Sequence, residues 1–182
     1  MHVSTSETRR RTLTLEDATV ELLDAAIADQ EHLSVLLDVV ASPGWEGFPE
    51  ALAPLRDSLT RPSGTGSWGP LLFVLDNPRT LVGLGGFYGP PSTEGVVEIG
   101  YAIAPAFQNQ CWATEAVRLM IGAATARPEV VAVDATTLAE ENASTAVLGK
   151  HGFVRIGERN DPEDGPVWQW RRARAASDSP IR

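Results

Sequence analysis

The stretch from residue 71 to residue 105 constrains the fold most, because three apolar runs follow one another there with only short turns between them. The first two runs, LLFVLD and TLVGLGGFYG, flank the turn residues NPR, and the third, VVEIGYAIAP, follows the turn PPSTEG. Apolar runs separated by proline- and glycine-containing links are typical of strands joined by tight turns. The stretch therefore predicts an antiparallel meander of three strands.

The segments before the meander have a helical pattern, after a short edge strand at residues 11–15. Apolar residues recur at helical spacing from Ala18 to Ile27 and again from Leu33 to Val40. A loop rich in proline and glycine follows, and a further short helix is expected from Glu50 to Leu59.

After the meander, the pattern alternates between helices and strands. An apolar helical stripe, a buried strand, a short helix and two closing strands are expected at residues 113–124, 130–136, 142–150, 153–158 and 166–172. This order predicts an α/β (α+β) fold with a mixed, mostly antiparallel sheet of about six to seven strands and helices on both faces.

The chain has 182 residues, of which 43% are hydrophobic, enough for one core and too few for two ordinary domains. A single domain is expected over residues 11–173. Residues 1–10 are expected to be a flexible arm and residues 174–182 a disordered tail, because both ends are small, polar and charged.

The net charge of −9 disfavours a nucleic-acid partner and favours a cationic one. One cysteine cannot form an internal disulfide, and three histidines show no zinc-type spacing, so no metal is expected. The amino terminus lacks the apolar core of a signal peptide, and no apolar run is long enough to span a membrane. These features predict a cytoplasmic protein without a membrane partner.

The loop QNQCWATEA joins the third meander strand to the following helix, the place where backbone N–H groups at a helix start can hold a phosphate. Two segments, VEIGYAIAPAFQNQCWATEAV and ENASTAVLGKHGF, resemble in order and spacing the motifs of the GNAT family of acetyl-coenzyme A dependent N-acetyltransferases. The resemblance covers roughly residues 71–172. It is nearest to the branch of ribosomal-protein alanine and serine acetyltransferases.

The resemblance implies acetyl-CoA as cosubstrate, with its pantetheine paired to the third meander strand and its pyrophosphate on the loop. Asn142, besides its expected role as a helix N-cap, would touch the pantetheine arm. The implied cofactor-binding residues are Tyr101, Ala102, Ile103, Gln108, Asn109, Gln110, Cys111, Trp112, Ala113, Thr114 and Asn142.

Cys111 occupies the position of the family's motif glycine, and Asn109 replaces a second frequent glycine. Asparagine tolerates a left-handed backbone better than most residues. If Cys111 needs a positive φ, its Cβ should cost about 1 kcal/mol and weaken cofactor binding. If its φ is negative, only the shape of the contact changes.

Acetyl transfer to an amine needs a base that removes the ammonium proton. Glu98 is the candidate, because it shares a strand face with Gly100 and Ala102 in an otherwise apolar strand; an ion pair or a turn contact is the alternative role. The resemblance implies that Ser144 lies near the thioester sulfur. Trp45 and Phe48, in a loop that also carries Glu46, are candidates for the acceptor pocket, although such loops are also ordinary surface features.

Three functions remain open from the sequence. The first is an N-acetyltransferase that acts on a primary amine of a small molecule or a protein N-terminus by direct attack in a ternary complex. The second is a non-catalytic CoA-binding or sensing domain, in which Cys111 and the lack of the tyrosine acid of several GNAT branches would have removed turnover. A hydrolase with Cys111 as nucleophile lacks a recognisable base partner. The closing strands could also pair between subunits, which leaves a homodimer open.

Overall fold

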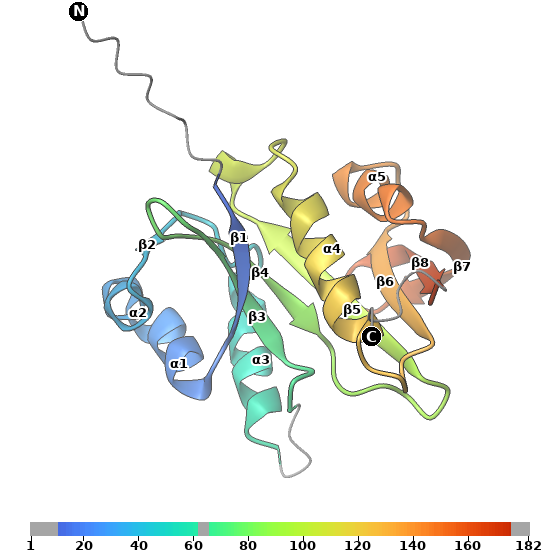
Figure 1. Cartoon of the computed structure of the whole chain (residues 1–182), viewed down its shortest axis with the longest axis horizontal. Helices are drawn as coiled ribbons and strands as arrows, with labels where there is room; N and C mark the ends of the chain where they lie inside the picture. The colour runs from blue at the N-terminus through green and yellow to red at the C-terminus, as the bar shows by residue number, and fades with distance from the viewer. Residues whose placement is uncertain (1–10, 62–65, 176–182) are drawn as a thin grey trace, which may run out of the picture.

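The computed structural model describes residues 11–61 and 66–175, and its centre is an eight-stranded sheet (Figure 1). Seven strands follow the order β1 (Leu13–Asp17), β3 (Pro70–Leu75), β4 (Thr80–Phe87), β5 (Val96–Ile103), β6 (Ala132–Leu138), β8 (Gly165–Ala173) and β7 (Val154–Asp161). The eighth, β2 (Val40–Ala41), pairs with β4. The pairs β5–β6 and β2–β4 are parallel and the others antiparallel, which confirms the predicted mixed sheet.

The strand count exceeds the expected six to seven because of β2. The helical spacing that was expected to run on to Val40 ends earlier, at Leu37. Asp38 then adopts a left-handed conformation with a φ of 51°, which turns the chain so that Val40 can pair with Thr80. The spacing of apolar residues alone does not predict this turn.

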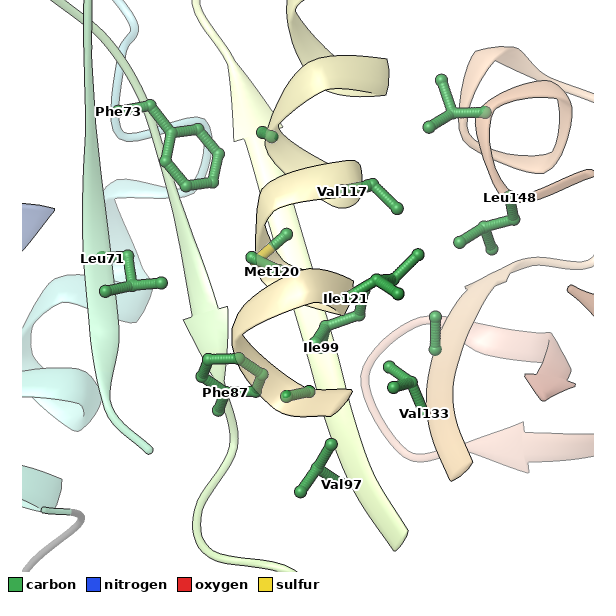
Figure 2. Close-up of a cluster of buried hydrophobic side chains, with 14 of the residues drawn as sticks. Leu71, Phe73, Phe87, Val97, Ile99, Val117, Met120, Ile121, Val133 and Leu148 are labelled. Atoms are coloured by element: carbon green, nitrogen blue, oxygen red, sulfur yellow. The ribbon is translucent and has the colours of Figure 1, made fainter. Parts of the chain in front are cut away.

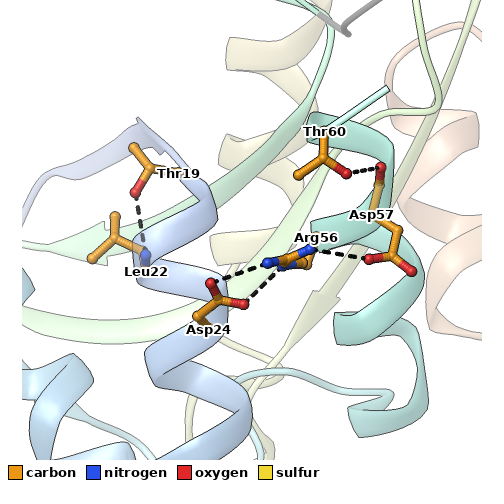
Figure 3. Close-up of polar contacts among 6 residues, drawn as sticks. All are labelled: Thr19, Leu22, Asp24, Arg56, Asp57 and Thr60. Atoms are coloured by element: carbon orange, nitrogen blue, oxygen red, sulfur yellow. Dashed lines mark hydrogen bonds and ion pairs between the residues drawn. The ribbon is translucent and has the colours of Figure 1, made fainter. Parts of the chain in front are cut away.

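Within the described residues, five α-helices cover the sheet: α1 (Val20–Ala28), α2 (Gln30–Leu37), α3 (Leu52–Leu59), α4 (Trp112–Thr125) and α5 (Ala143–Lys150). Short 3-10 helices, η1 (Pro49–Ala51) and η2 (Pro105–Phe107), precede α3 and α4. Asp29 separates α1 from α2, and its carboxylate accepts hydrogen bonds from the first N–H groups of α2. Arg56 of α3 forms an exposed ion pair with Asp24 of α1 at 2.8 Å (Figure 3).

Two apolar cores lie on opposite faces of the sheet. The larger core packs α4 and α5 against one face, with Met120 and Ile99 among its buried side chains (Figure 2). The smaller core packs α1, α2 and α3 against the other face, mainly over β3 and β4. This second layer includes no buried side chain of β6, so the β5–β6 half of that face keeps part-exposed polar side chains.

The domain extends slightly further than expected at its carboxyl end. Arg174 was assigned to a disordered tail, but its backbone N–H donates to Val131 O at 2.8 Å and its guanidinium donates to Arg127 O at 2.9 Å. The expected arm at 1–10 and the rest of the tail lie outside the described residues. Among residues 11–61 and 66–175, no helix has the length and apolar character to span a membrane.

Candidate functional site

The site begins where two parallel strands separate. β5 and β6 pair from Val96 and Ala132 to Ile99 and Ala135, and their pairing then stops. β5 continues to Ile103 and β6 to Leu138, each still paired with its outer neighbour. An opening bounded by backbone groups of the two strands therefore lies in the middle of the sheet.

Alternation along β5 decides which residues face this opening. The N–H of Ala104 donates to Val82 O, and the carbonyl of Glu98 accepts from Tyr88 N, so even-numbered residues direct their backbone groups toward β4. Tyr101 and Ile103 therefore face the opening, but the backbone of Ala102 faces β4. The expectation that Ala102 also pairs with a ligand there is wrong, because successive residues of a strand point to opposite sides.

The loop after β5 presents a row of free backbone donors. The first N–H bonded into α4 is that of Glu115, which donates to Cys111 O at 3.0 Å. In the part of the chain that the structure describes, the N–H groups of residues 109–114 donate to no residue. Unpaired donors at a helix start attract anions, because the helix dipole adds a partial positive charge.

Two residues of this loop have a left-handed backbone. The φ angle is 59° at Asn109 and 66° at Cys111, the residue that precedes α4. Cys111 is exposed, and its side chain does not cap the helix. Of the two alternatives for Cys111, the structure has the positive φ, which a Cβ disfavours.

The glutamine side chains of the loop bind backbone carbonyls of the residues that precede it. Gln108 Nε2 donates to Ile103 O at 3.0 Å, and Gln110 Nε2 donates to Ala106 O at 2.9 Å. The first bond occupies the last carbonyl of β5 that faces the opening. Gln108 therefore fixes the loop against the end of β5, and Gln110 fixes it against η2.

Helix α5 lines the other side of the opening. Asn142 accepts the N–H of Thr145 at 3.1 Å, which confirms its predicted N-cap role. Tyr101 crosses from β5 to α5, where its hydroxyl donates to the carbonyl of Ser144 at 3.3 Å. Burial raises the pKa of Tyr101 to about 12, although the bond to Ser144 acts in the opposite direction. Tyr101 therefore remains a neutral phenol that connects the two elements.

His151 joins the two helices at this end of the molecule. It follows α5 directly, and its Nε2 lies 2.9 Å from the carbonyl oxygen of Thr114 on α4. The start of α4 and the end of α5 are thus connected. The next residue, Gly152, has a φ of 77°, the left-handed conformation that glycine commonly adopts after a helix end.

Glu98 lies on the face of the sheet opposite α4, next to the last paired residues of β5 and β6. Thr136 donates its hydroxyl proton to Glu98 Oε1 at 2.9 Å, which leaves Glu98 Oε2 without a described partner. Asp134, opposite Glu98 in the parallel register, forms a two-pronged pair with Arg171 at 2.7 and 2.8 Å. The neighbouring negative charge is therefore compensated. The alternative of an ion pair is not realised by Glu98 itself.

The aromatic candidates lie in different environments. Trp45 is only 1% exposed and belongs to the smaller core, where its indole donates to Gln30 Oε1 at 3.0 Å. Phe48 is 63% exposed. Trp112, the first residue of α4, packs partly against the larger core. Of the two acceptor candidates, only Phe48 thus offers an open surface, and Trp45 serves packing.

The sequence did not single out Thr136, although it contacts the candidate base. It would have been found only from the register of β5 against β6, which no local pattern encodes. No group of three or more potential metal ligands occurs among the described residues.

The opening in the sheet, the free donors before α4 and the capped start of α5 agree with one family. A model of the Acetyltransferase (GNAT) domain matches residues 11–154. The chain belongs to this family, and acetyl-CoA-dependent transfer of an acetyl group is the enzyme activity that membership carries.

Relatives agree with this assignment. The chain is 30% identical over 151 residues to an uncharacterized N-acetyltransferase, YjdG, of Bacillus subtilis (strain 168), which covers 81% of this chain and 88% of the relative. Among solved structures, RimL, a ribosomal L7/L12 alpha-N-protein acetyltransferase in complex with coenzyme A, superposes with a TM-score of 0.63 at 16% identity, covering 89% of this chain and 94% of that one. An aminoglycoside acetyltransferase, AAC(6')-Ib with coenzyme A, has a TM-score of 0.58 at 21% identity, covering 91% and 95%.

Proposed function

We propose that this enzyme transfers an acetyl group from acetyl-CoA to a primary amine of a small molecule or a protein N-terminus, by direct attack within a ternary complex. The observation that carries the proposal is the opening between β5 and β6, with a carboxylate beside it and unpaired N–H groups at its end. Two fold neighbours, an aminoglycoside acetyltransferase and a ribosomal-protein N-acetyltransferase, represent these two kinds of acceptor.

The backbone around the opening is suited to acetyl-CoA. Tyr101 and the N–H of Ile103 offer hydrogen bonds to the amides of a pantetheine arm laid along β5. The N–H groups of residues 109–114 would hold the pyrophosphate. Asn142 and Ser144 border the opening from α5. Acetyl-CoA supplies the activated acyl group, and the residues of this chain orient it.

Glu98 is the proposed base. An amine is protonated at neutral pH, and only its neutral form can attack a carbonyl carbon. Because Thr136 donates to one oxygen of Glu98, the carboxylate is held in place and its other oxygen can accept the ammonium proton, directly or through a water molecule. The thiol that leaves has an ordinary pKa near 8.5, so it needs little assistance.

The test combines coenzyme binding with acetyl transfer in Glu98→Gln. We expect calorimetry to give an unchanged dissociation constant for CoA, while kcat/KM for amines falls at least about 100-fold, because a general base contributes 10²- to 10⁴-fold. Glu94→Gln is the matched control, since Glu94 is an exposed glutamate in the turn before β5. Full transfer by Glu98→Gln would refute the role of Glu98.

A coenzyme-binding domain without turnover is the alternative. The strained φ of Cys111 favours it, because Cys111 lies in the loop of residues 108–111 (the anion loop), where strain weakens phosphate binding. Binding of CoA by the native protein, with no transfer to any amine in a broad panel, would replace the enzyme proposal with this one.

A further inference from the structure

Tyr88, which no sequence pattern singled out, places a phenol at the mouth of the opening. It directly follows β4, and its N–H donates to the carbonyl of Glu98 at 3.0 Å. Its side chain reaches back over β5, where a Cβ built on Gly100 would lie 2.6 Å from the Tyr88 hydroxyl oxygen. Gly100 therefore leaves the space that the phenol occupies.

The phenol and the proposed base share one face of the sheet. Glu98 and Gly100 are two residues apart in β5, so their side-chain positions point to the same side, about 7 Å apart along the strand. The pairing of β5 with β6 ends between them, at Ile99. The Tyr88 hydroxyl thus lies next to Glu98 and beside the place where the two strands separate.

The ring of Tyr88 is exposed, and its hydroxyl has no described partner. Tyr88 is 70% exposed, and its hydroxyl makes no hydrogen bond with any residue in the described ranges. Most of the ring faces solvent, whereas its outer end lies against β5. The pKa of Tyr88 is raised, first by burial of this end and then by the negative charges of Glu98 and Asp164. The phenol therefore keeps its proton and retains lone pairs for a donor.

We propose that Tyr88 and Glu98 together form the binding site for the ammonium group of the acceptor, which we name the ammonium site. One N–H of a primary alkylammonium ion donates to the Tyr88 hydroxyl oxygen and a second donates to Glu98 Oε2. This inference rests on the proposed function, because it concerns the acceptor of that reaction. Tyr88 acts as a specificity-determining residue, which binds and orients the amine while Glu98 removes its proton.

The charges around the ammonium site define the class of acceptor. Both charges that act on Tyr88 are negative, and Asp164 adds to Glu98 from the turn between β7 and β8. Arg171, which pairs with Asp134 in the β6–β8 register, has its guanidinium bonded to that carboxylate. The site therefore favours a primary amine on a neutral or cationic molecule over one that carries acidic groups beside the amine.

The experiment uses the two tyrosines of the chain as reporters. The full-length protein is labelled with ¹³C at the phenol carbon of tyrosine, and Tyr88→Phe assigns the two resonances. Butylamine hydrochloride is titrated at neutral pH, with butanol as an uncharged probe of similar shape. We expect butylammonium to shift the Tyr88 resonance saturably and to leave Tyr101, on the opposite face of β5, unchanged; butanol should shift neither.

Two variants test the role of Tyr88 in acceptor binding independently of the resonance titration. Tyr88→Phe should raise the KM for butylamine about tenfold, since one hydrogen bond to a charged group is lost, with an unchanged dissociation constant for CoA. Gly100→Ala should have an effect in the same direction, because its Cβ displaces the phenol. Gly122→Ala is the matched control, since a Cβ there meets no atom within 4 Å.

The outcomes separate the two proposals. A Tyr88 shift with both probes, a shift with neither, or an unchanged KM in Tyr88→Phe would overturn the ammonium site while leaving acetyl transfer intact. If the native protein binds no CoA and acetylates no amine, the proposed function fails, and the titration of Tyr88 still decides whether the ammonium site exists.

Discussion

Replacement of Cys111 by glycine should stabilise the protein, although it removes a side chain. Cys111 has a φ of 66°, a conformation that costs an L-residue about 1–2 kcal/mol. Glycine relieves this strain, but it adds about 0.4–1 kcal/mol of conformational entropy to the unfolded chain. Because the thiol is exposed and caps nothing, little contact energy is lost. The net gain expected for Cys111→Gly is about 0.5–1 kcal/mol.

Urea unfolding, followed by far-UV circular dichroism, measures this gain directly. The midpoint should rise with an unchanged slope, and the thermal midpoint should rise by about 2 °C for a domain of this size. Cys111→Ala is the control, because it removes the sulfur and keeps the Cβ; it should stay within about 0.5 kcal/mol of the native protein. Calorimetric titration with CoA should show tighter binding in the glycine variant alone.

A glycine variant that is no more stable than the native protein would refute the reasoning. The positive φ would then carry no net strain in the native loop. An alanine variant as stable as the glycine variant would point instead to the thiol as the unfavourable group. Equal CoA affinity in all three proteins would show that the Cβ does not approach the phosphate.

Three further predictions concern stability. The pKa of Tyr101 is raised to about 12, above its unfolded value near 10. The stability that Tyr101 contributes is therefore complete below pH 10 and is lost as the pH rises from 10 to 12. Urea titrations should show this loss as about 2–3 kcal/mol in the native protein and should not show it in Tyr101→Phe. Met120→Ala should lower the free energy of unfolding by about 2–5 kcal/mol, because Met120 of α4 is fully buried in the larger core. Asn142→Ala should cost about 1 kcal/mol through loss of its reciprocal cap with Thr145, and Asn142→Asp should retain most of it. Thermal unfolding of each variant, with Thr145→Val as a second probe of the cap, checks these values.

The anion loop shows which features of a site a local sequence pattern can predict. Its position between a strand and an apolar helical stripe was predictable, because both elements have clear periodicity. Its backbone conformation was not predictable, since neither asparagine nor cysteine requires a positive φ. Only the folded chain, in which Gln108 binds the end of β5, decides that Asn109 and Cys111 turn left-handed.

The loop that carries Trp45 and Phe48 shows what spacing cannot predict. Trp45 and Phe48 are both aromatic and lie three residues apart, yet Trp45 is buried in the smaller core and Phe48 is exposed. The difference arises from Gly44 and Gly47, whose positive φ angles turn the loop onto β5, where Gly47 packs against Ala102. Sequence spacing cannot rank two aromatics in such a loop.

By itself, the sequence determined the order of the elements, the mixed sheet and the family, because these depend on periodicity, turn residues and motif spacing within neighbouring stretches. It also identified Glu98 as the carboxylate of an apolar strand. The tertiary structure alone decided what surrounds Glu98. Thr136 lies on the parallel strand β6, and Tyr88 directly follows β4. Both contacts depend on how these strands align with β5 in the sheet, which the pattern within a single segment does not encode.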